Sequence, residues 1–358
     1  MAISGIPSLK VFGPSPSPSP SPSPSPSHSH TFFPTKISLS SNCWTSHLSH
    51  CQTPPNSNFL PPLSLSSSMA SAVRATSSSA IGTTSSVEVG ENDLLIVGPG
   101  VLGRLVAQQW SQDHLGCQVY GKTVTTDHHD ELIKIGITPI LKGTMLPRQF
   151  PYVIFCAPPS RSSDYAGDVR EAASSWNGEG SFVFTSSTAL VDCSDNGSCD
   201  EHTPTVPMGR SPRTEVLLQA ESVVFDHGGC AVRLSGLYIS FLGAHTYWLK
   251  QGKVELRPDH FVNLIHYEDA ASLAIAIMKK KYRARVFLGC DNHPLSRQEI
   301  MDLVNGSGKF SGKFEGFTGT NDALGKRLNN SKTRAEIGWE PKYSSFAEFL
   351  EAMEMSER

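Results

Sequence analysis

Short apolar runs alternate with amphipathic stretches over residues 93 to about 235. The apolar runs predict strands at 94–97, 118–120, 138–141, 152–155, 181–185 and 231–234. The stretches between them predict helices at 102–111, 130–135, 165–175 and 214–225. Strand–helix alternation of this kind is typical of an α/β fold with a doubly wound parallel sheet. Ligands of such sheets bind beyond the carboxyl ends of the strands, where the strand order reverses.

Three further segments follow the predicted sheet. Residues 263–269 lead into a helix that ends in lysines at 279–281, a charge order that fits the helix dipole. Ser296 and Glu299 have the spacing of a capping box that opens another helix. A Gly-Trp-Glu-Pro break then precedes a final amphipathic helix at about 346–355. We therefore predict a sheet domain over 88–235 and a small C-terminal substrate lobe over 236–358, intertwined with it.

The first 87 residues have a different composition. They contain no Asp or Glu and only three basic residues, and Pro and Ser alternate without a break from Pro14 to Ser27. Such a segment buries too little apolar area to fold. Its acid-poor, Ser-rich character predicts a transit peptide, and the scarcity of Arg favours the chloroplast stroma over the mitochondrion. An ordinary disordered tail is the alternative, and Met69 is a candidate second start.

Without this leader the chain is acidic. It holds 27 basic and 33 acidic residues, a net charge of −6. An acidic body argues against non-specific nucleic-acid binding, which depends on Lys and Arg. No uninterrupted apolar run approaches the ~18–20 residues of a membrane helix. The cysteine spacing predicts no metal site, and the oligomeric state stays open, a homo-oligomer included.

The stretch from 93 to 103 carries the strongest chemical signal. Its apolar run ends in Gly-x-Gly-x-x-Gly, and a predicted helix follows at once. Such glycines let the backbone turn sharply and approach phosphates, while the helix N-terminus offers free N–H groups and a partial positive charge. The order predicts a Rossmann-type dinucleotide site formed by Gly98, Gly100, Val101, Leu102 and Gly103. A glycine turn without a ligand and an S-adenosylmethionine site are the alternatives.

The segment after the second predicted strand bears on the cofactor. Rossmann sites selective for NAD usually carry Asp or Glu about 20 residues after the glycines. Residues 119–126 hold no acid, whereas Lys122 and three threonines, Thr123 among them, could meet a 2′-phosphate. We therefore predict NADP as the cofactor, with NAD as the alternative. A solvated loop lysine is the alternative reading of Lys122.

Four more segments carry motifs: a strand ending in a serine cluster at 184–189, Arg-x-x-Gly-x-Tyr at 233–238, Ile-His-Tyr-Glu-Asp-Ala-Ala at 265–271 and a tail at 324–350. With the glycine turn, they resemble the extended and atypical short-chain dehydrogenases/reductases, the NAD(P)-dependent epimerase/dehydratase group. The resemblance covers about residues 93 to 350. It implies that Ser187 hydrogen-bonds a substrate oxygen, and that His266 and Asp269 brace the substrate lobe. It also implies a nicotinamide groove lined by Ala157, Pro158 and Pro159.

The sequence departs from that family at its proton-transfer pair, Tyr-x-x-x-Lys on one helix face. None of the eight tyrosines has Lys four residues later. One register puts Met208 and Pro212 in the two positions, and another puts Arg213 and Leu217 there. Relocated groups then become candidates: the phenol of Tyr165 or Tyr238, and the guanidinium of Arg210 or Arg213 directed at substrate or phosphate.

Two classes of function follow. The first is an NADP-dependent oxidoreductase, epimerase or dehydratase acting on a small or sugar-like substrate. The second is a non-catalytic cofactor-binding protein, acting as a sensor, scaffold or RNA-binding protein. Two local features stay open as well. The aromatic segment 241–248 forms a substrate pocket, core or a dimer face, and Cys193 and Cys199 flank a short turn as a regulatory disulfide or as free thiols.

Overall fold

The computed structural model describes residues 89–353 except Met145 and Pro147. The predicted leader and the second start at Met69 therefore lie outside the described residues. Within them, no helix is both long enough and apolar enough to cross a membrane.

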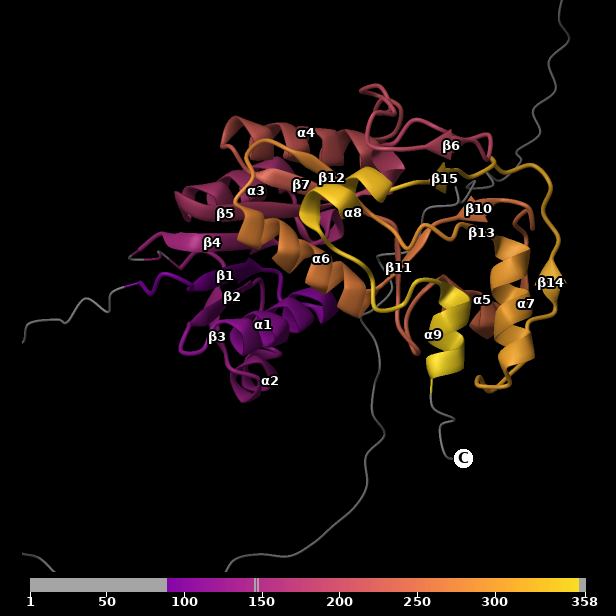
Figure 1. Ribbon diagram of the computed structural model, residues 1–358, viewed down its shortest axis with the longest axis horizontal. Helices are drawn as coiled ribbons and strands as arrows, with labels where there is room; N and C mark the ends of the chain where they lie inside the picture. Colours follow the sequence, from indigo (N-terminus) through magenta and orange to yellow (C-terminus); the bar gives the residue numbers. More distant parts are fainter. Residues whose placement is uncertain (1–88, 145, 147, 354–358) are drawn as a thin grey trace, which may run out of the picture. The chain divides into compact units, whose positions relative to one another are not determined.

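One parallel sheet organises the described residues (Figure 1). Its order is β3-β2-β1-β4-β5-β7-β12, and every neighbouring pair is parallel. The strands are β1 (Leu94–Val97), β2 (Val119–Thr123), β3 (Ile137–Leu141), β4 (Phe150–Phe155), β5 (Trp176–Ser187), β7 (Cys230–Leu234) and β12 (Val286–Gly289). The order reverses between β1 and β4, so the doubly wound fold class is confirmed.

Helices cover both faces of this sheet (Figure 1). Strand β1 shows why: Leu94 and Ile96 belong to one core cluster, while Leu95 belongs to the other. Alternate side chains of a strand point to opposite faces, so each face is apolar. The first cluster packs under α1 (Val101–Asp113) and α6 (Tyr267–Lys280). The second packs under α3 (Tyr165–Ser174) and α4 (Pro212–Asp226).

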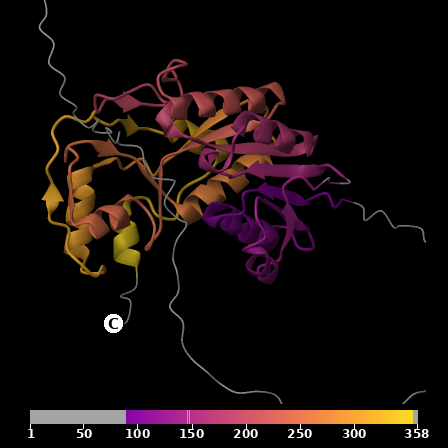
Figure 2. The same ribbon diagram turned by 180° about the vertical axis from the view of Figure 1, so that it is seen from behind.

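A smaller lobe lies beside the sheet, as the reverse view shows (Figure 2). Its core joins α5 (Ala244–Gln251), α7 (Arg297–Ser307) and α9 (Phe346–Ala352). The remaining helices are α2 (His129–Lys134), α8 (Ser331–Ile337) and the 3₁₀ turns η1 (Pro159–Arg161) and η2 (Thr188–Leu190). Short strand pairs complete the fold: β8 (Gly236–Tyr238) with β11 (Leu264–His266), β9 (Lys253–Val254) with β14 (Gly316–Phe317), β10 (Phe261–Val262) with β13 (Leu295–Ser296) and β6 (Ser198–Cys199) with β15 (Arg327–Leu328).

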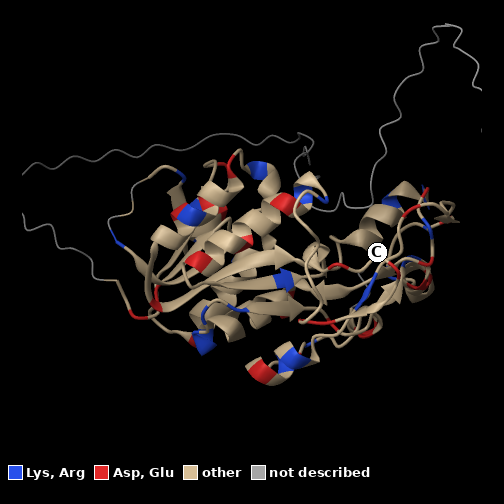
Figure 3. Cartoon of the chain, turned by 90° about the horizontal axis from the view of Figure 1, so that it is seen from above, with Lys and Arg blue, Asp and Glu red and all other residues tan. Residues whose placement is uncertain are grey.

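Charged residues of both signs are interspersed over the described elements (Figure 3). Several of them are paired, as Lys279 is with Asp113 and Arg285 is with Glu336.

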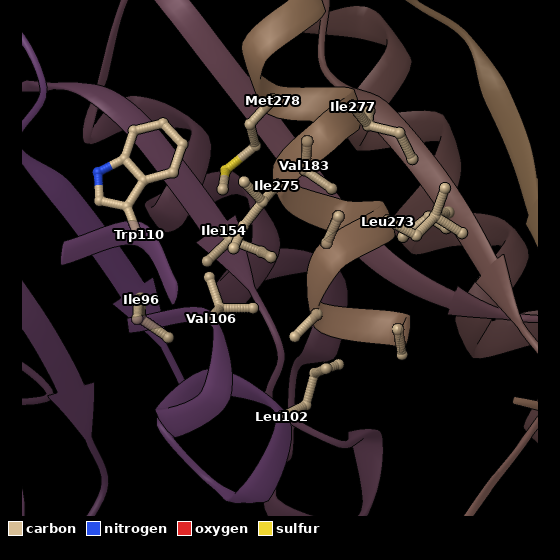
Figure 4. Packing of buried hydrophobic residues seen from close by; sticks show 14 of the residues in the cluster. Ile96, Leu102, Val106, Trp110, Ile154, Val183, Leu273, Ile275, Ile277 and Met278 are labelled. Atoms are coloured by element: carbon tan, nitrogen blue, oxygen red, sulfur yellow. The ribbon is translucent and has the colours of Figure 1, made fainter. Parts of the chain in front are cut away.

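The packing of α1 against α6 determines where the glycine turn lies (Figure 4). Leu102, Val106 and Trp110 project from one face of α1 into the core shared with α6 and the sheet. Trp110 is fully buried and donates from Nε1 to the carbonyl of Asn92, 2.9 Å away. These contacts hold α1 with its N-terminus at the carboxyl end of β1.

Candidate functional site

Two of the three glycines in the turn after β1 are required by the protein itself. Gly98 has φ of +81°, and a Cβ there would lie 2.6 Å from the Cα of Ala157. At Gly103, a Cβ would lie 2.9 Å from Cγ2 of Ile96 and 3.1 Å from the carbonyl oxygen of Gly98. A side chain at either position would force the turn away from β4 or helix α1 away from β1.

Gly100 is different because nothing in the protein requires glycine there. Its φ is −77°, which any residue adopts, and a Cβ would meet no atom within 4 Å. It is also the N-cap of α1, and no side chain caps the helix. An uncapped helix N-terminus leaves N–H groups for another partner, and an anion suits them. Open space above Gly100 fits the close approach of a pyrophosphate.

The segment after β4 lies against this turn. Ala157 touches the position that a Gly98 side chain would take. Pro158 and Pro159 follow and begin the turn η1. All three are half-buried at the point where the strand order reverses. Their position beside the glycine turn agrees with a role in the groove, and contact with nicotinamide stays a prediction.

The structure contradicts the alternative that Lys122 is a solvated lysine in a loop. It is part of β2, only 6% exposed, and its Nζ donates to Oε1 of Glu171 on α3 at 2.9 Å. Its charge is thus balanced by a carboxylate. The neighbouring Thr123 hydroxyl lies 2.7 Å from Nε2 of His129. Binding of a 2′-phosphate by Lys122 stays a prediction, and it requires the pair with Glu171 to open.

Ser187 ends β5 beside the same edge of the sheet. Its Oγ accepts a hydrogen bond from the amide of Ala189 at 3.1 Å and caps η2. The side chain is half-buried. Because this contact uses a lone pair, the hydroxyl proton can be donated to a substrate oxygen. The geometry is compatible with the predicted role.

The neighbouring Ser186 belongs to a buried polar network that sequence reasoning missed. Ser186 donates from Oγ to Oε1 of Glu221 at 2.6 Å. Arg233 binds both oxygens of that carboxylate, from Nε at 3.0 Å and from Nη2 at 2.7 Å. All three side chains are less than 10% exposed. The network joins β5, α4 and β7, and its Ser186 precedes the predicted substrate residue in the chain.

The structure corrects both tyrosine candidates. Tyr165 is buried in the core beside Phe155, and its hydroxyl donates to the carbonyl of Ala157 at 2.8 Å. Burial raises the pKa of the Tyr165 phenol well above its ordinary range. Tyr238 is fully buried in the lobe, and burial raises the pKa of its phenol as well. Neither phenol is suited to proton transfer at neutral pH.

The start of α4 offers no replacement pair in either register. Ser211 caps the helix by accepting from the amide of Thr214, and Pro212 follows in the first turn. Leu217 lies in the core, so the second register places an apolar side chain where the family has lysine. Arg210 pairs with Asp192 at 3.2 Å, and Arg213 lies half-buried in the first turn of α4. A catalytic role for Arg213 stays a prediction.

His266 and Asp269 lie where the main sheet domain meets the smaller lobe. The carboxylate of Asp269 accepts from the amides of Lys342 at 2.6 Å and Tyr343 at 3.1 Å. Nδ1 of His266 accepts from the amide of Glu268 at the start of α6. Burial lowers the pKa of His266 to about 4, so the ring is neutral. The two contacts of Asp269 tie α6 to the segment before α9.

The aromatic segment divides between core and surface. His245 and Trp248 are each 1% exposed, which contradicts a role for them in an open pocket. Phe241 and Tyr247 are exposed.

Among the described residues, no group of His, Cys, Asp and Glu is arranged to hold a metal ion. The candidate site is therefore the edge formed by the glycine turn, the segment after β4 and Ser187.

Comparison with solved structures identifies the fold. A conserved protein of unknown function from Silicibacter pomeroyi DSS is 21% identical, with a TM-score of 0.61 over 73% of this chain and 97% of that one. The dTDP-glucose 4,6-dehydratase of Bacillus anthracis, solved with NAD, is 13% identical with a TM-score of 0.61 over 73% and 94%. The UDP-glucuronic acid 4-epimerase of Bacillus cereus, also solved with NAD, is 14% identical with a TM-score of 0.58 over 73% and 94%.

These likenesses show that the chain has the Rossmann-type fold of NAD-dependent sugar epimerases and dehydratases. No family model matches the sequence, and no curated protein matches it. At such low identity, function has to be argued from the site itself.

Proposed function

We propose that this chain binds a nicotinamide dinucleotide and uses it in an oxidoreductase, epimerase or dehydratase reaction on a small or sugar-like substrate. The open space at Gly100 carries the proposal. Glycine at that position has no reason in the backbone or in neighbouring protein atoms. A pyrophosphate close to the backbone supplies the reason, and the uncapped N-terminus of α1 supplies its hydrogen-bond donors.

The residues present fit such a cofactor. Gly98 allows the sharp turn, Gly100 leaves room for the phosphates, and Gly103 allows α1 to pack against β1. The dinucleotide fold uses its three glycines in this order. A bound nicotinamide would exchange hydride with the substrate. The dehydratase and epimerase that share the fold were solved with NAD, which supports this class of cofactor.

The preference for NADP rests on residues 119–126, which lack an acid. The buried pair of Lys122 with Glu171 weakens the case for a phosphate contact at that lysine. Lys122→Met tests it: if Lys122 binds the 2′-phosphate, the variant loses NADPH affinity and keeps NADH affinity. Equal loss of both would assign the lysine to folding alone.

Ser187 is the residue that we assign to the substrate. The Ser187 hydroxyl caps η2 by accepting a hydrogen bond and keeps its proton for a substrate oxygen, and Ser187→Ala removes that donor. We expect turnover to fall about 10²-fold, the usual cost of one well-placed donor, with little change in dinucleotide affinity. Ser187→Thr, which keeps the hydroxyl, is the control. Unchanged turnover in Ser187→Ala would remove this role.

The leader composition supports a place for the protein in the chloroplast stroma. Fusion of residues 1–87 to a fluorescent protein tests that proposal. Import into plastids supports it, and cytosolic fluorescence contradicts it.

A non-catalytic sensor or scaffold that binds the cofactor is the second candidate. The buried state of Tyr165 and Tyr238 favours it, because neither of these two phenols is positioned for proton transfer. An RNA-binding form of this candidate is disfavoured by the acidic net charge of the chain without its leader. A gel-shift at physiological salt beside an NADPH titration separates them: RNA affinity without a cofactor response would favour the RNA-binding role.

A further inference from the structure

A pair of cysteines lies in the loop that follows η2. Cys193 and Cys199 are separated by a tight turn, and the carbonyl oxygen of Gly197 is an acceptor for both thiols. The distances to that oxygen are 3.5 Å from Cys193 and 3.6 Å from Cys199. Both sulfur atoms therefore lie around one carbonyl oxygen. The thiol of Cys193 has a second, nearer acceptor in Oδ1 of Asp195, at 3.2 Å. Both cysteines are free thiols in the structure.

The two thiols interact with each other but differ in accessibility. Burial, and then the hydrogen bond with the thiol of Cys193, raises the pKa of Cys199 to about 12. Cys199 is 4% exposed, whereas Cys193 is half-buried. The outer sulfur of Cys193 can therefore meet a reagent, while Cys199 stays protonated behind it.

A lysine connects this pair to the candidate site. Nζ of Lys326 donates to the carbonyl of Thr188 at 3.1 Å and also to that of Val191. These carbonyls lie at the two ends of η2, the turn that Ser187 caps. The carbonyl oxygen of Val191 also accepts from the amide of Cys193 at 3.0 Å, so Lys326 and Cys193 meet at one acceptor. Burial lowers the pKa of Lys326, and negative charge on Cys199 or Cys193 would raise it. Cys193, Cys199 and Lys326 form one thiol–lysine cluster.

We propose that Cys193 and Cys199 are a reversible oxidation site whose disulfide changes the loop held by Lys326. The oxidant is a low-molecular-weight or protein disulfide. Cys193 loses its proton, and its thiolate attacks one sulfur of the oxidant, forming a mixed disulfide and releasing one thiolate. Cys199 then loses its proton and attacks the sulfur of Cys193, releasing the second thiolate. The chain is oxidised by two electrons, and the oxidant leaves as two thiols.

Bond formation cannot leave the loop unchanged. The sulfurs must close to about 2.05 Å, and neither can then donate to a carbonyl. The carbonyl of Gly197 loses both thiol donors, and the backbone between the cysteines must adjust. That backbone is fixed by β6 pairing with β15, which begins directly after Lys326. Oxidation is therefore transmitted to the carbonyls at the ends of η2. This step does not depend on the proposed cofactor.

The test uses the full chain in buffers that contain reduced and oxidised glutathione in varied ratio. Free thiols are alkylated after equilibration, and the protein is digested with trypsin. Both cysteines fall in one tryptic peptide, 171–210. A second digestion, which cleaves before Asp195, places the two cysteines in separate fragments. Fragments that stay joined in the absence of reductant show the disulfide bond between Cys193 and Cys199. We expect the bond to appear in one two-electron transition, and dithiothreitol to reverse it.

Matched variants make the result specific. Cys117→Ser changes another half-buried cysteine far from the pair in sequence, and it should oxidise as the wild type does. Cys193→Ser and Cys199→Ser should yield no joined fragments. Alkylation of both thiols at every glutathione ratio, or glutathione retained on Cys193, would overturn the proposal.

The coupling to η2 needs its own readout. Amide hydrogen exchange of residues 187–192 should differ between reduced and oxidised wild type by at least twofold in rate. Cys193→Ser should show no difference between the same two buffers. A disulfide that forms with identical exchange rates would refute the transmission through Lys326. In Lys326→Met, the carbonyls of Thr188 and Val191 lose their shared donor. The amides of residues 187–192 should therefore exchange, in both buffers, at the faster of the two wild-type rates.

Discussion

Alanine at each of the three glycines should separate their roles. Gly98→Ala places a methyl group 2.6 Å from the backbone of Ala157 at a φ of +81°. The left-handed backbone costs about 1–2 kcal/mol, and the overlap adds roughly 1–3 kcal/mol. Gly103→Ala meets Ile96 and the Gly98 carbonyl at 2.9 and 3.1 Å, which costs a similar overlap without the backbone term. Both variants should be clearly less stable than the wild type.

Gly100→Ala should behave in the opposite way. Its methyl group meets no protein atom, and its φ is ordinary. Alanine is a poorer N-cap than glycine by up to about 1 kcal/mol, which the stiffer unfolded chain offsets by about 0.4–1 kcal/mol. The free energy of unfolding should therefore stay within about 1 kcal/mol of the wild-type value. Dinucleotide affinity should fall at least tenfold, equivalent to about 1.4 kcal/mol, because the methyl group takes the place of the phosphate.

Urea unfolding measures the first quantity and calorimetric titration the second. The wild type and Gly100→Ala are compared at equal concentration, with Gly98→Ala as the destabilised control. Wild-type affinity in Gly100→Ala would refute the assignment of that space to a pyrophosphate. Wild-type stability in Gly98→Ala would refute the structural argument for the turn.

Two further predictions concern buried charge. Glu221→Gln leaves the guanidinium of Arg233 buried without a carboxylate and should cost about 3–5 kcal/mol of unfolding free energy; a loss under about 1 kcal/mol in urea would contradict this. Burial lowers the pKa of His245 and of His266 to about 4. The unfolded chain, with histidine pKa values near 6.5, then binds more protons between pH 6.5 and 4, so stability should fall with acidification by up to about 1.4 kcal/mol per pH unit for each ring. Burial of Asp291 raises the pKa of its carboxyl to about 8. Its protonation makes stability rise with acidification and so offsets the contribution of one histidine ring. Stability independent of pH from 6.5 to 4.5 would contradict the account, and His266→Gln should reduce the slope.

The main sheet could be predicted because its strands are apolar on both faces. Continuous apolar runs such as Leu94–Val97 stand out from the polar turns around them. Strand β12 was not predicted, and β5 begins at Trp176, five residues before the predicted start. The first residues of β5 include Asn177 and Glu179, which are exposed and carry no apolar pattern. The short pairs of the lobe depend on long-range contacts that periodicity does not report.

The sequence itself holds a signal against a catalytic role for Tyr165. This tyrosine shares a helical face with Val169, Ala172 and Ala173, and that face is buried. A tyrosine on such a face is expected in the core.

The ion pairs could not be read from the chain. Lys122 and Glu171 come from β2 and α3, and Glu221 and Arg233 come from α4 and β7. Each pair depends on how a helix crosses a strand, which local pattern does not determine. The glycine turn was predictable for the opposite reason, since strand, turn and helix are consecutive.

The most direct test of the central claim is a calorimetric titration of the full chain with NAD, NADH, NADP and NADPH. The account predicts one-to-one binding of at least one of these nucleotides to the wild type, with binding weakened at least tenfold in Gly100→Ala. No binding of any of the four to a protein whose circular dichroism shows it folded would contradict the claim that the turn after β1 is a dinucleotide site.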